Sequence, residues 1–298
     1  MSDGIVPTLS ELVALRGVAQ RRGPARRGRH HVTGPAQSSL RGRGMEYAES
    51  REYVAGDDVR HIDWRLTARS GRTHTKLFQA ERERLTLIVA DTAPALYFGT
   101  RVRFKSVQAA RAGAVAAWQA VREGDRVAIL RGSVAEAPVP PASGTRGALR
   151  ALDALVRWYT APPLDDTGLP DALHHAARLL RPGSRLIVLA DPRSVAALPE
   201  ARWPALATHH EVAVLLLTDP LETDPPAATL PFALGARRVE LDLANAAQRQ
   251  GWRREFVQPV EQALERLPRR GVRVWSLSTD AASDAWLPLL GRAQPQVA

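Results

Sequence analysis

Leu85-Thr86-Leu87-Ile88-Val89-Ala90-Asp91 decides the fold, because six residues of nearly unbroken apolar character end on a carboxylate. Such a run is typical of a parallel strand whose two faces are both buried. Two later segments repeat the pattern, residues 184–190 before Asp191 and residues 211–218 before Asp219. Right-handed crossovers place the carboxyl ends of parallel strands at one edge of a sheet, so we expect the three aspartates to converge there.

Helix-like segments separate these strands. Their apolar periodicity predicts helices over residues 104–121, 145–158, 169–180 and 245–267, and further strands over residues 126–130, 237–243 and 272–277. Alternating strands and helices favour an α/β fold with a doubly wound, mainly parallel sheet of about five or six strands. Near the start of the chain, Thr8 and Glu11 fit a capping box and predict a short amphipathic helix.

Charge and composition predict three parts along the chain. We expect a basic arm over residues 1–40, a charged module over residues 41–84 and the α/β domain over residues 85–298. Eight arginines and no acid lie from Arg16 to Arg43, which is typical of a solvated arm. The arm has no aromatic residues for base stacking, so nucleic-acid binding is a minor hypothesis, which the salt dependence of affinity would test.

Several classes of protein are disfavoured by the sequence. It has no cysteine, which excludes disulfides and thiolate metal sites and is compatible with a reducing cytoplasm, where we expect the protein to be. The longest apolar run, residues 212–217, is far shorter than the roughly 20 residues of a bilayer-spanning helix. We therefore expect a soluble protein without membrane insertion or a signal peptide. No phosphate-binding Gly-rich motif occurs, so no bound nucleotide is expected.

Two carboxylates and a hydroxyl form the first candidate site. Asp91 and Asp191 each end a predicted strand, and Thr167 lies in the loop before the helix over residues 169–180. Oxygen ligands of this kind suit Mg²⁺, and a metal-dependent hydrolase is the enzymatic hypothesis. The alternative is that the aspartates cap the turns that follow them. No nucleophile lies beside a base with an orienting third group, so no catalytic residue is predicted.

The second candidate site is a dense run of charged and aromatic residues. Gly56 favours a tight turn, Asp57 or Asp58 can cap the next helical turn, and Trp64 offers a large apolar anchor. The residues predicted to bind a protein partner are Arg51, Asp57, Asp58, Arg60, Asp63, Trp64 and Arg69. Two interpretations stay open: an ion-pair network that attaches this segment to the α/β domain, or a recognition surface for a protein or an anionic group.

The same run carries a specific set of motifs. It reads Gly44-Met45-Glu46-Tyr47, Arg51-Glu52-Tyr53, Gly56-Asp57-Asp58-Val59-Arg60, Ile62-Asp63-Trp64 and Ala68-Arg69, and residues 219–222 add Asp-Pro-Leu-Glu. With these motifs, most of the chain resembles the bacterial "domain of unknown function 58" family. The resemblance implies a von Willebrand factor type A-like domain, preceded by a β-rich or irregular insertion.

The resemblance also implies a partner. It points to MoxR-type AAA+ ATPases and to chaperone-like assembly or metal insertion, with no established enzymatic reaction. In the von Willebrand type A fold, a metal-ion-dependent adhesion site has the form Asp-x-Ser-x-Ser, then a loop Thr, then a strand-end Asp. Asp91, Thr167 and Asp191 match that pattern, whereas Ala93 and Ala95 replace both serines. We therefore expect a degenerate site with weak or no Mg²⁺, on an adaptor or accessory factor for such an ATPase.

Overall fold

The computed structural model describes residues 4–21, 45–80, 84–132, 136–162, 168–234 and 237–291. The chain divides into two compact units, one of residues 27–83 and one that combines residues 1–26 with residues 84–298. The smaller unit is therefore an insertion in the larger one. Each unit is described by itself below.

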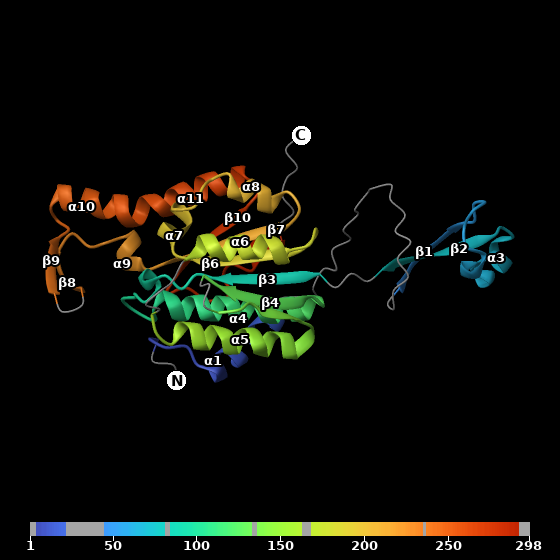
Figure 1. The fold of residues 1–298 in the computed structure, drawn as a ribbon, viewed down its shortest axis with the longest axis horizontal. Helices are drawn as coiled ribbons and strands as arrows, with labels where there is room; N and C mark the ends of the chain where they lie inside the picture. Colours follow the sequence, from blue (N-terminus) through green and yellow to red (C-terminus); the bar gives the residue numbers. More distant parts are fainter. Residues whose placement is uncertain are drawn as a thin grey trace. The chain divides into compact units, whose positions relative to one another are not determined.

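A six-stranded sheet forms the centre of the larger unit (Figure 1). In spatial order its strands are β10 (Arg273–Ser278), β7 (Glu211–Thr218), β6 (Arg185–Ala190), β3 (Leu85–Ala90), β4 (Arg126–Arg131) and β5 (Val139–Ala142). All neighbours pair in parallel except β4 and β5, which are antiparallel. The predicted α/β fold with a mainly parallel sheet is confirmed at this level.

The strands are apolar throughout because both faces of the sheet are covered. Along β3, Ile88 and Ala90 face one hydrophobic core, and Leu87 and Val89 face the other. Successive side chains of a strand point to opposite faces of the sheet. Because both faces are buried here, every position of the strand needs an apolar residue. The continuous apolar runs in the sequence are therefore explained by two cores, one on each side of the sheet.

Helices form the two outer layers (Figure 1). The first face packs against α1 (Leu9–Ala14), α2 (Arg16–Arg21), α4 (Lys105–Glu123) and α5 (Gly144–Tyr159). The second face packs against α6 (Leu169–Leu179), α7 (Pro192–Ala196), α8 (Arg202–Ala207) and α11 (Gln258–Arg269). Among the described residues, no helix is long and apolar enough to cross a membrane.

The two N-terminal helices belong to the larger unit. Leu12 and Leu15 are buried in its first core, and the Trp118 indole N–H donates to the Leu12 carbonyl at 3.1 Å. Thr8 caps α1 as the sequence predicts, accepting from the Glu11 N–H. The Glu11 carboxylate, which a capping box would direct back to Thr8, pairs with Arg111 of α4.

The connections between strands reverse direction at one point of the sheet. From β3 the chain moves through α4 to β4 on one side, and it later returns to place β6 on the other side of β3. The segments that follow β3 and β6 thus diverge to opposite faces. In open α/β sheets, this switch point at the carboxyl ends of two neighbouring strands is where ligands bind.

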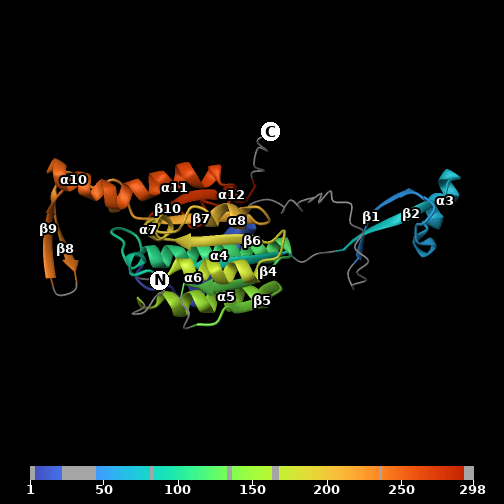
Figure 2. The same cartoon turned by 45° about the horizontal axis from the view of Figure 1, so that its top comes forward.

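A two-stranded ribbon extends the larger unit beyond its sheet (Figures 1 and 2). It is formed by β8 (Thr229–Leu234) and β9 (Arg237–Asp242), which follow the short helix α9 (Pro220–Thr223). Next come α10 (Ala246–Trp252), a π-helical turn η3 (Arg253–Val257) and α11, and the described chain ends with α12 (Pro288–Gly291). The single long helix predicted over residues 245–267 is thus interrupted by the π turn.

The smaller unit is an antiparallel pair of strands with short helices between them. Strand β1 (Met45–Glu52) pairs with β2 (His74–Ala80), and the 3-10 turn η1 (Val59–His61) and α3 (Trp64–Ser70) connect them. Its ends lead to the larger unit through residues outside the described ranges.

Candidate functional site

The three strand-end aspartates lie at the carboxyl edge of the sheet, in the strand order β3, β6 and β7. Their exposed fractions are 0% for Asp91, 1% for Asp191 and 0% for Asp219. Asp91 and Asp191 are in direct contact at the switch point, where the Asp91 Oδ2 accepts from the Asp191 backbone N–H at 3.0 Å. The sequence therefore predicts this convergence, but not how completely it is buried.

A buried lysine completes this part of the edge. Lys105, the first residue of α4, is 0% exposed, and its Nζ donates to Asp191 Oδ2 at 2.8 Å and to Glu222 Oε1 at 2.6 Å. The sequence predicts neither Lys105 nor Glu222 as a site residue, although Glu222 belongs to the Asp-Pro-Leu-Glu motif. The rarity of lysine could have drawn attention to Lys105, because the sequence has only two lysines among its 41 Lys and Arg residues.

Asp219 has a structural role at this edge. Its carboxylate accepts four hydrogen bonds from neutral donors, namely the Thr100 N–H, the Thr100 hydroxyl, the Leu221 N–H and the Thr279 hydroxyl. Asp219 also forms a capping box with Glu222 at the start of α9. It therefore ties the ends of β7 and β10 to the loop that precedes α4.

The carboxylate oxygens of the predicted metal ligands already have N–H partners. Asp91 accepts from the backbone of Ala93 and Asp191, and Asp191 accepts from Arg193 and Lys105. Within the described residues, no group of three or more His, Cys, Asp or Glu side chains is arranged to hold a metal ion. Thr167, the predicted hydroxyl ligand, lies outside the described residues. As arranged here, the two described carboxylates, Asp91 and Asp191, do not fit a divalent cation.

Burial and the lysine set the protonation of these acids. Burial raises the pKa of Asp91 to about 6, against a hydrogen bond from Ser194 that lowers it. Burial also acts to raise the pKa of Asp191, but Lys105 and Arg193 together outweigh it, so the pKa of Asp191 is lowered. For Glu222 burial outweighs the same ammonium, so the pKa of Glu222 is raised. The two acids thus differ in their other neighbours, because Arg193 also lowers the pKa of Asp191 whereas the charge of Asp191 raises that of Glu222.

Asp91 is expected to give stability a specific pH dependence. A carboxyl whose pKa is raised on folding binds its proton more tightly in the folded state, so its stabilisation exists at acidic pH and is lost as pH rises through 6. Between pH 5 and 7, the difference in free energy of unfolding between wild type and Asp91→Asn should fall by about 1 kcal/mol. Urea unfolding at several pH values measures this, and a constant difference would contradict it.

Aromatic and cationic side chains connect the buried acids with α10 and the π turn. Arg193 donates to Asp191 at 3.2 Å, and its guanidinium lies 5.1 Å from the Phe256 ring of the π turn. Trp252 stacks on Phe256, with ring centroids 4.4 Å apart, and its indole N–H donates to the Glu222 carbonyl at 3.0 Å. Phe256 thus contacts Arg193 from within the π turn, before the chain continues as α11.

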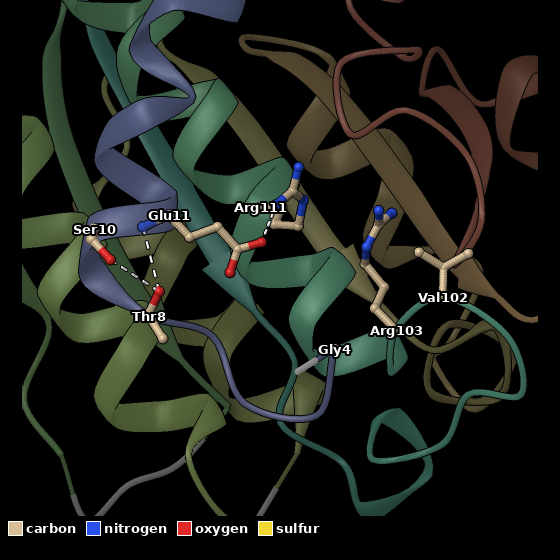
Figure 3. Close-up of a pocket in the computed structure, with 7 residues that line it drawn as sticks. All are labelled: Gly4, Thr8, Ser10, Glu11, Val102, Arg103 and Arg111. Carbon is tan, nitrogen blue, oxygen red and sulfur yellow. Dashed lines mark hydrogen bonds and ion pairs between the residues drawn. The ribbon is translucent and has the colours of Figure 1, made fainter. Parts of the chain in front are cut away.

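Two open pockets of this unit lie elsewhere. One, of about 430 Å³, is lined by Gly4, Thr8, Ser10, Glu11, Val102, Arg103 and Arg111 (Figure 3). The other, of about 370 Å³, is lined by Thr223, Asp224, Pro225, Ala246, Arg249, Gln250, Trp252, Arg253 and Val257. Neither is lined by the strand-end aspartates. In the first, Arg103 donates to the carbonyls of Thr279 and Ala281, and Arg111 pairs with Glu11, so both cations have structural partners.

In the smaller unit, the predicted contact residues first serve local structure. Asp57 accepts from Arg51 at 2.7 Å and from the Val54 N–H, and these donors lower the pKa of Asp57. Asp58 caps η1 and Asp63 caps α3. The three acids that were predicted to bind a partner therefore stabilise the connection between β1 and α3.

Apolar side chains and cations of the same connection face outward. Trp64 is 69% exposed, Val59 is 61% exposed and Val54 is 59% exposed. The Arg60 side chain is 73% exposed although it pairs with Asp58, and Arg69 is exposed in the last turn of α3. We call Val54, Val59, Arg60 and Trp64 the module surface. An exposed indole offers a large apolar area of the kind found at the centres of protein interfaces.

Comparisons with known proteins extend these observations. Residues 49–273 match the model of the family described as "Protein of unknown function DUF58". This range includes the module surface, Lys105 and all three strand-end aspartates. The match begins inside β1 and ends at the first residue of β10, so it covers parts of both units.

Three mycobacterial proteins are similar in sequence. An uncharacterized protein of Mycobacterium bovis and uncharacterized proteins of two strains of Mycobacterium tuberculosis are each 30% identical over 190 residues. The aligned part is 62% of this chain and 58% of each relative, so somewhat more than half of those proteins is matched.

Proposed function

The chain belongs to the DUF58 family, and from this premise we propose that it is a protein-binding accessory factor, or adaptor, whose partner is a MoxR-type AAA+ ATPase. The observation that carries the proposal is the module surface, where Trp64 is 69% exposed and two valines and an arginine of the same connection between β1 and β2 are exposed as well. Tryptophan and arginine are the side chains most enriched at the energetic centres of protein interfaces. The choice of partner rests on the resemblance of residues 41–83 to the family signature.

We also propose that the larger unit is von Willebrand factor type A-like. Its mainly parallel sheet has a switch point between β3 and β6, and the aspartates that follow those strands are in contact there. In this proposal the carboxyl edge supports binding without a chemical reaction. The buried carboxylates, each held by N–H donors, support a scaffold role for this edge better than hydrolysis.

The experiment is direct binding between the full chain and a purified MoxR-type ATPase of the same genome, followed by biolayer interferometry in physiological salt. Trp64→Ala is expected to weaken binding by about 30-fold or more, since a central interface tryptophan contributes at least about 2 kcal/mol. Leu149→Ala, which removes a 40% exposed apolar side chain on α5, is the matched control and should change affinity less than about threefold.

Equal affinities for Trp64→Ala and the wild type would refute the module surface as the contact. Thermal unfolding of both variants separates a binding role from an internal one. If Trp64→Ala lowers Tm by several degrees and leaves affinity unchanged, the indole packs within the chain instead. Failure of the wild type to bind the ATPase at micromolar concentration would refute the proposed partner.

A further inference from the structure

We propose that the Lys105 ammonium takes the position of a divalent cation at the carboxyl edge of the sheet, so that a cation of the chain itself holds this edge together and the edge is independent of metal ions. Removing the lysine should free one oxygen of Asp191 and one of Glu222, and so turn this pair of carboxylates into a divalent-cation site. This inference concerns the larger unit alone and does not depend on the proposed partner.

The geometry gives Lys105 two carboxylate ligands. Its Nζ lies 2.8 Å from Asp191 and 2.6 Å from Glu222, and all three side chains are at least nine-tenths buried. The contacts come from three segments far apart in sequence: the start of α4, the end of β6 and the helix α9. One ammonium therefore joins parts of the edge that a bridging metal ion would otherwise join.

Two general effects, the helix dipole and burial, make a lysine unfavourable at position 105. It is the first residue of the 19-residue helix α4, where the helix dipole favours acids and disfavours cations. Complete burial of an ammonium also carries a desolvation cost that carboxylate partners must offset. Neither helix formation nor apolar packing calls for a lysine here, so its two acid partners are the reason for its presence.

With the lysine in place, the surrounding donors leave little for a metal ion to coordinate, and only the two oxygens that Lys105 holds become free when it is removed. Backbone amides hold both oxygens of Asp91, and Arg193 holds the second oxygen of Asp191. Ala93 and Ala95, which follow Asp91, have no side-chain oxygen that could coordinate a metal ion. A tethered ammonium cannot dissociate as a metal ion can, so chelators and changes in Mg²⁺ concentration should leave this edge unchanged.

The test uses the full chain and its Lys105→Met variant, which keeps the length of the side chain and removes its charge. Calorimetry compares Tm in Mg²⁺, in Mn²⁺ and in a chelator, and Mn²⁺ electron paramagnetic resonance counts bound ions. Wild type should change by less than about 1 °C, and Lys105→Met should bind one Mn²⁺ and gain about 5–10 °C at saturating metal.

Two controls locate the effect. Lys76→Met alters the other lysine, which lies in β2 of the smaller unit, and should create no metal response. Adding Asp191→Asn to Lys105→Met should abolish the response, since one of the new ligands is removed. Lys105→Gln is measured in parallel, so that poor folding of a single variant does not decide the outcome.

A wild-type chain that binds one Mn²⁺, and loses it in Asp191→Asn, would overturn the inference, because the edge would then hold a metal with the lysine in place. Absence of any metal response in both Lys105→Met and Lys105→Gln would overturn it as well. A Lys105→Met chain that folds in Mn²⁺ and not in chelator would support it.

Discussion

Asp219→Ala is expected to lower the free energy of unfolding by about 3–5 kcal/mol, because it removes the acceptor of four hydrogen bonds in a fully buried position. The Thr100 and Thr279 hydroxyls and two backbone amides would lose their partner. The buried Thr279 hydroxyl, left without a partner, costs about 1–3 kcal/mol, and the losses at exposed Thr100 and half-buried Leu221 are smaller because water can replace the carboxylate there. Equilibrium unfolding in urea measures the loss.

Asp224→Ala is the matched control for this substitution. Asp224 follows the same short helix, α9, but its side chain is exposed, so its removal should change stability by no more than about 0.5 kcal/mol. If the two variants lose the same stability, the contacts of Asp219 do not hold the edge together. Asp219→Asn should fall between them, since it keeps one acceptor oxygen.

Arg185→Met is expected to cost about 3–5 kcal/mol at the opposite edge of the sheet. Arg185 is 4% exposed and donates to Glu123 at 2.7 Å and to Glu211 at 3.0 Å. Arg84 and Arg273 share these carboxylates, which forms a network around the amino ends of the strands. A methionine at this position would remove one of the cations that pair with Glu123 and Glu211. Arg84 and Arg273 can replace it only in part.

The pH dependence identifies the cause of that loss. Burial acts to raise the pKa of Glu123, but Arg185 and its other partners outweigh it, so the pKa is lowered. An acid whose pKa is lowered on folding contributes stability above its unfolded pKa and loses it as pH falls through the folded one. The difference between wild type and Arg185→Met should therefore shrink as the pH falls below 4. A difference that stays constant from pH 6 to 3 would point to packing alone.

Arg266→Met is the control for charge removal at the surface. Arg266 pairs with Glu200, and both side chains are about half exposed, so the loss should stay below about 1 kcal/mol. A comparable loss in both variants would mean that burial of the Arg185 network does not increase its contribution to the free energy of unfolding.

The buried parallel strands could be predicted because each needs an apolar side chain at every position. The edge strand β5 could not, since Pro140 and Pro141 in it are typical of a loop. Proline is tolerated in an edge strand because its missing N–H is not required by a neighbour. The π turn was also unpredictable, because the apolar period of residues 245–267 is compatible with one continuous helix.

The candidate site was predicted in part for a similar reason. Strand-end residues such as Asp91 and Asp191 follow from topology alone, because parallel strands bring their carboxyl ends together. Lys105 and Glu222 reach the same place from a helix start and from a short helix after β7, and no spacing rule connects them. Recognising them needs the three-dimensional pairing of a buried cation with two acids.

The insertion of residues 27–83 into the larger unit has a consequence for how the chain can be divided. A fragment that starts at Arg84 would contain every strand of the central sheet, yet it would lack the layer that Leu12, Leu15 and Ala19 supply to the first core. The indole N–H of Trp118 would lose its acceptor, and the apolar side chains of the first core would be exposed to water. We therefore expect such a fragment to aggregate. A chain nicked once between α2 and β3, by contrast, would keep that layer in place by packing, and would separate only on denaturation.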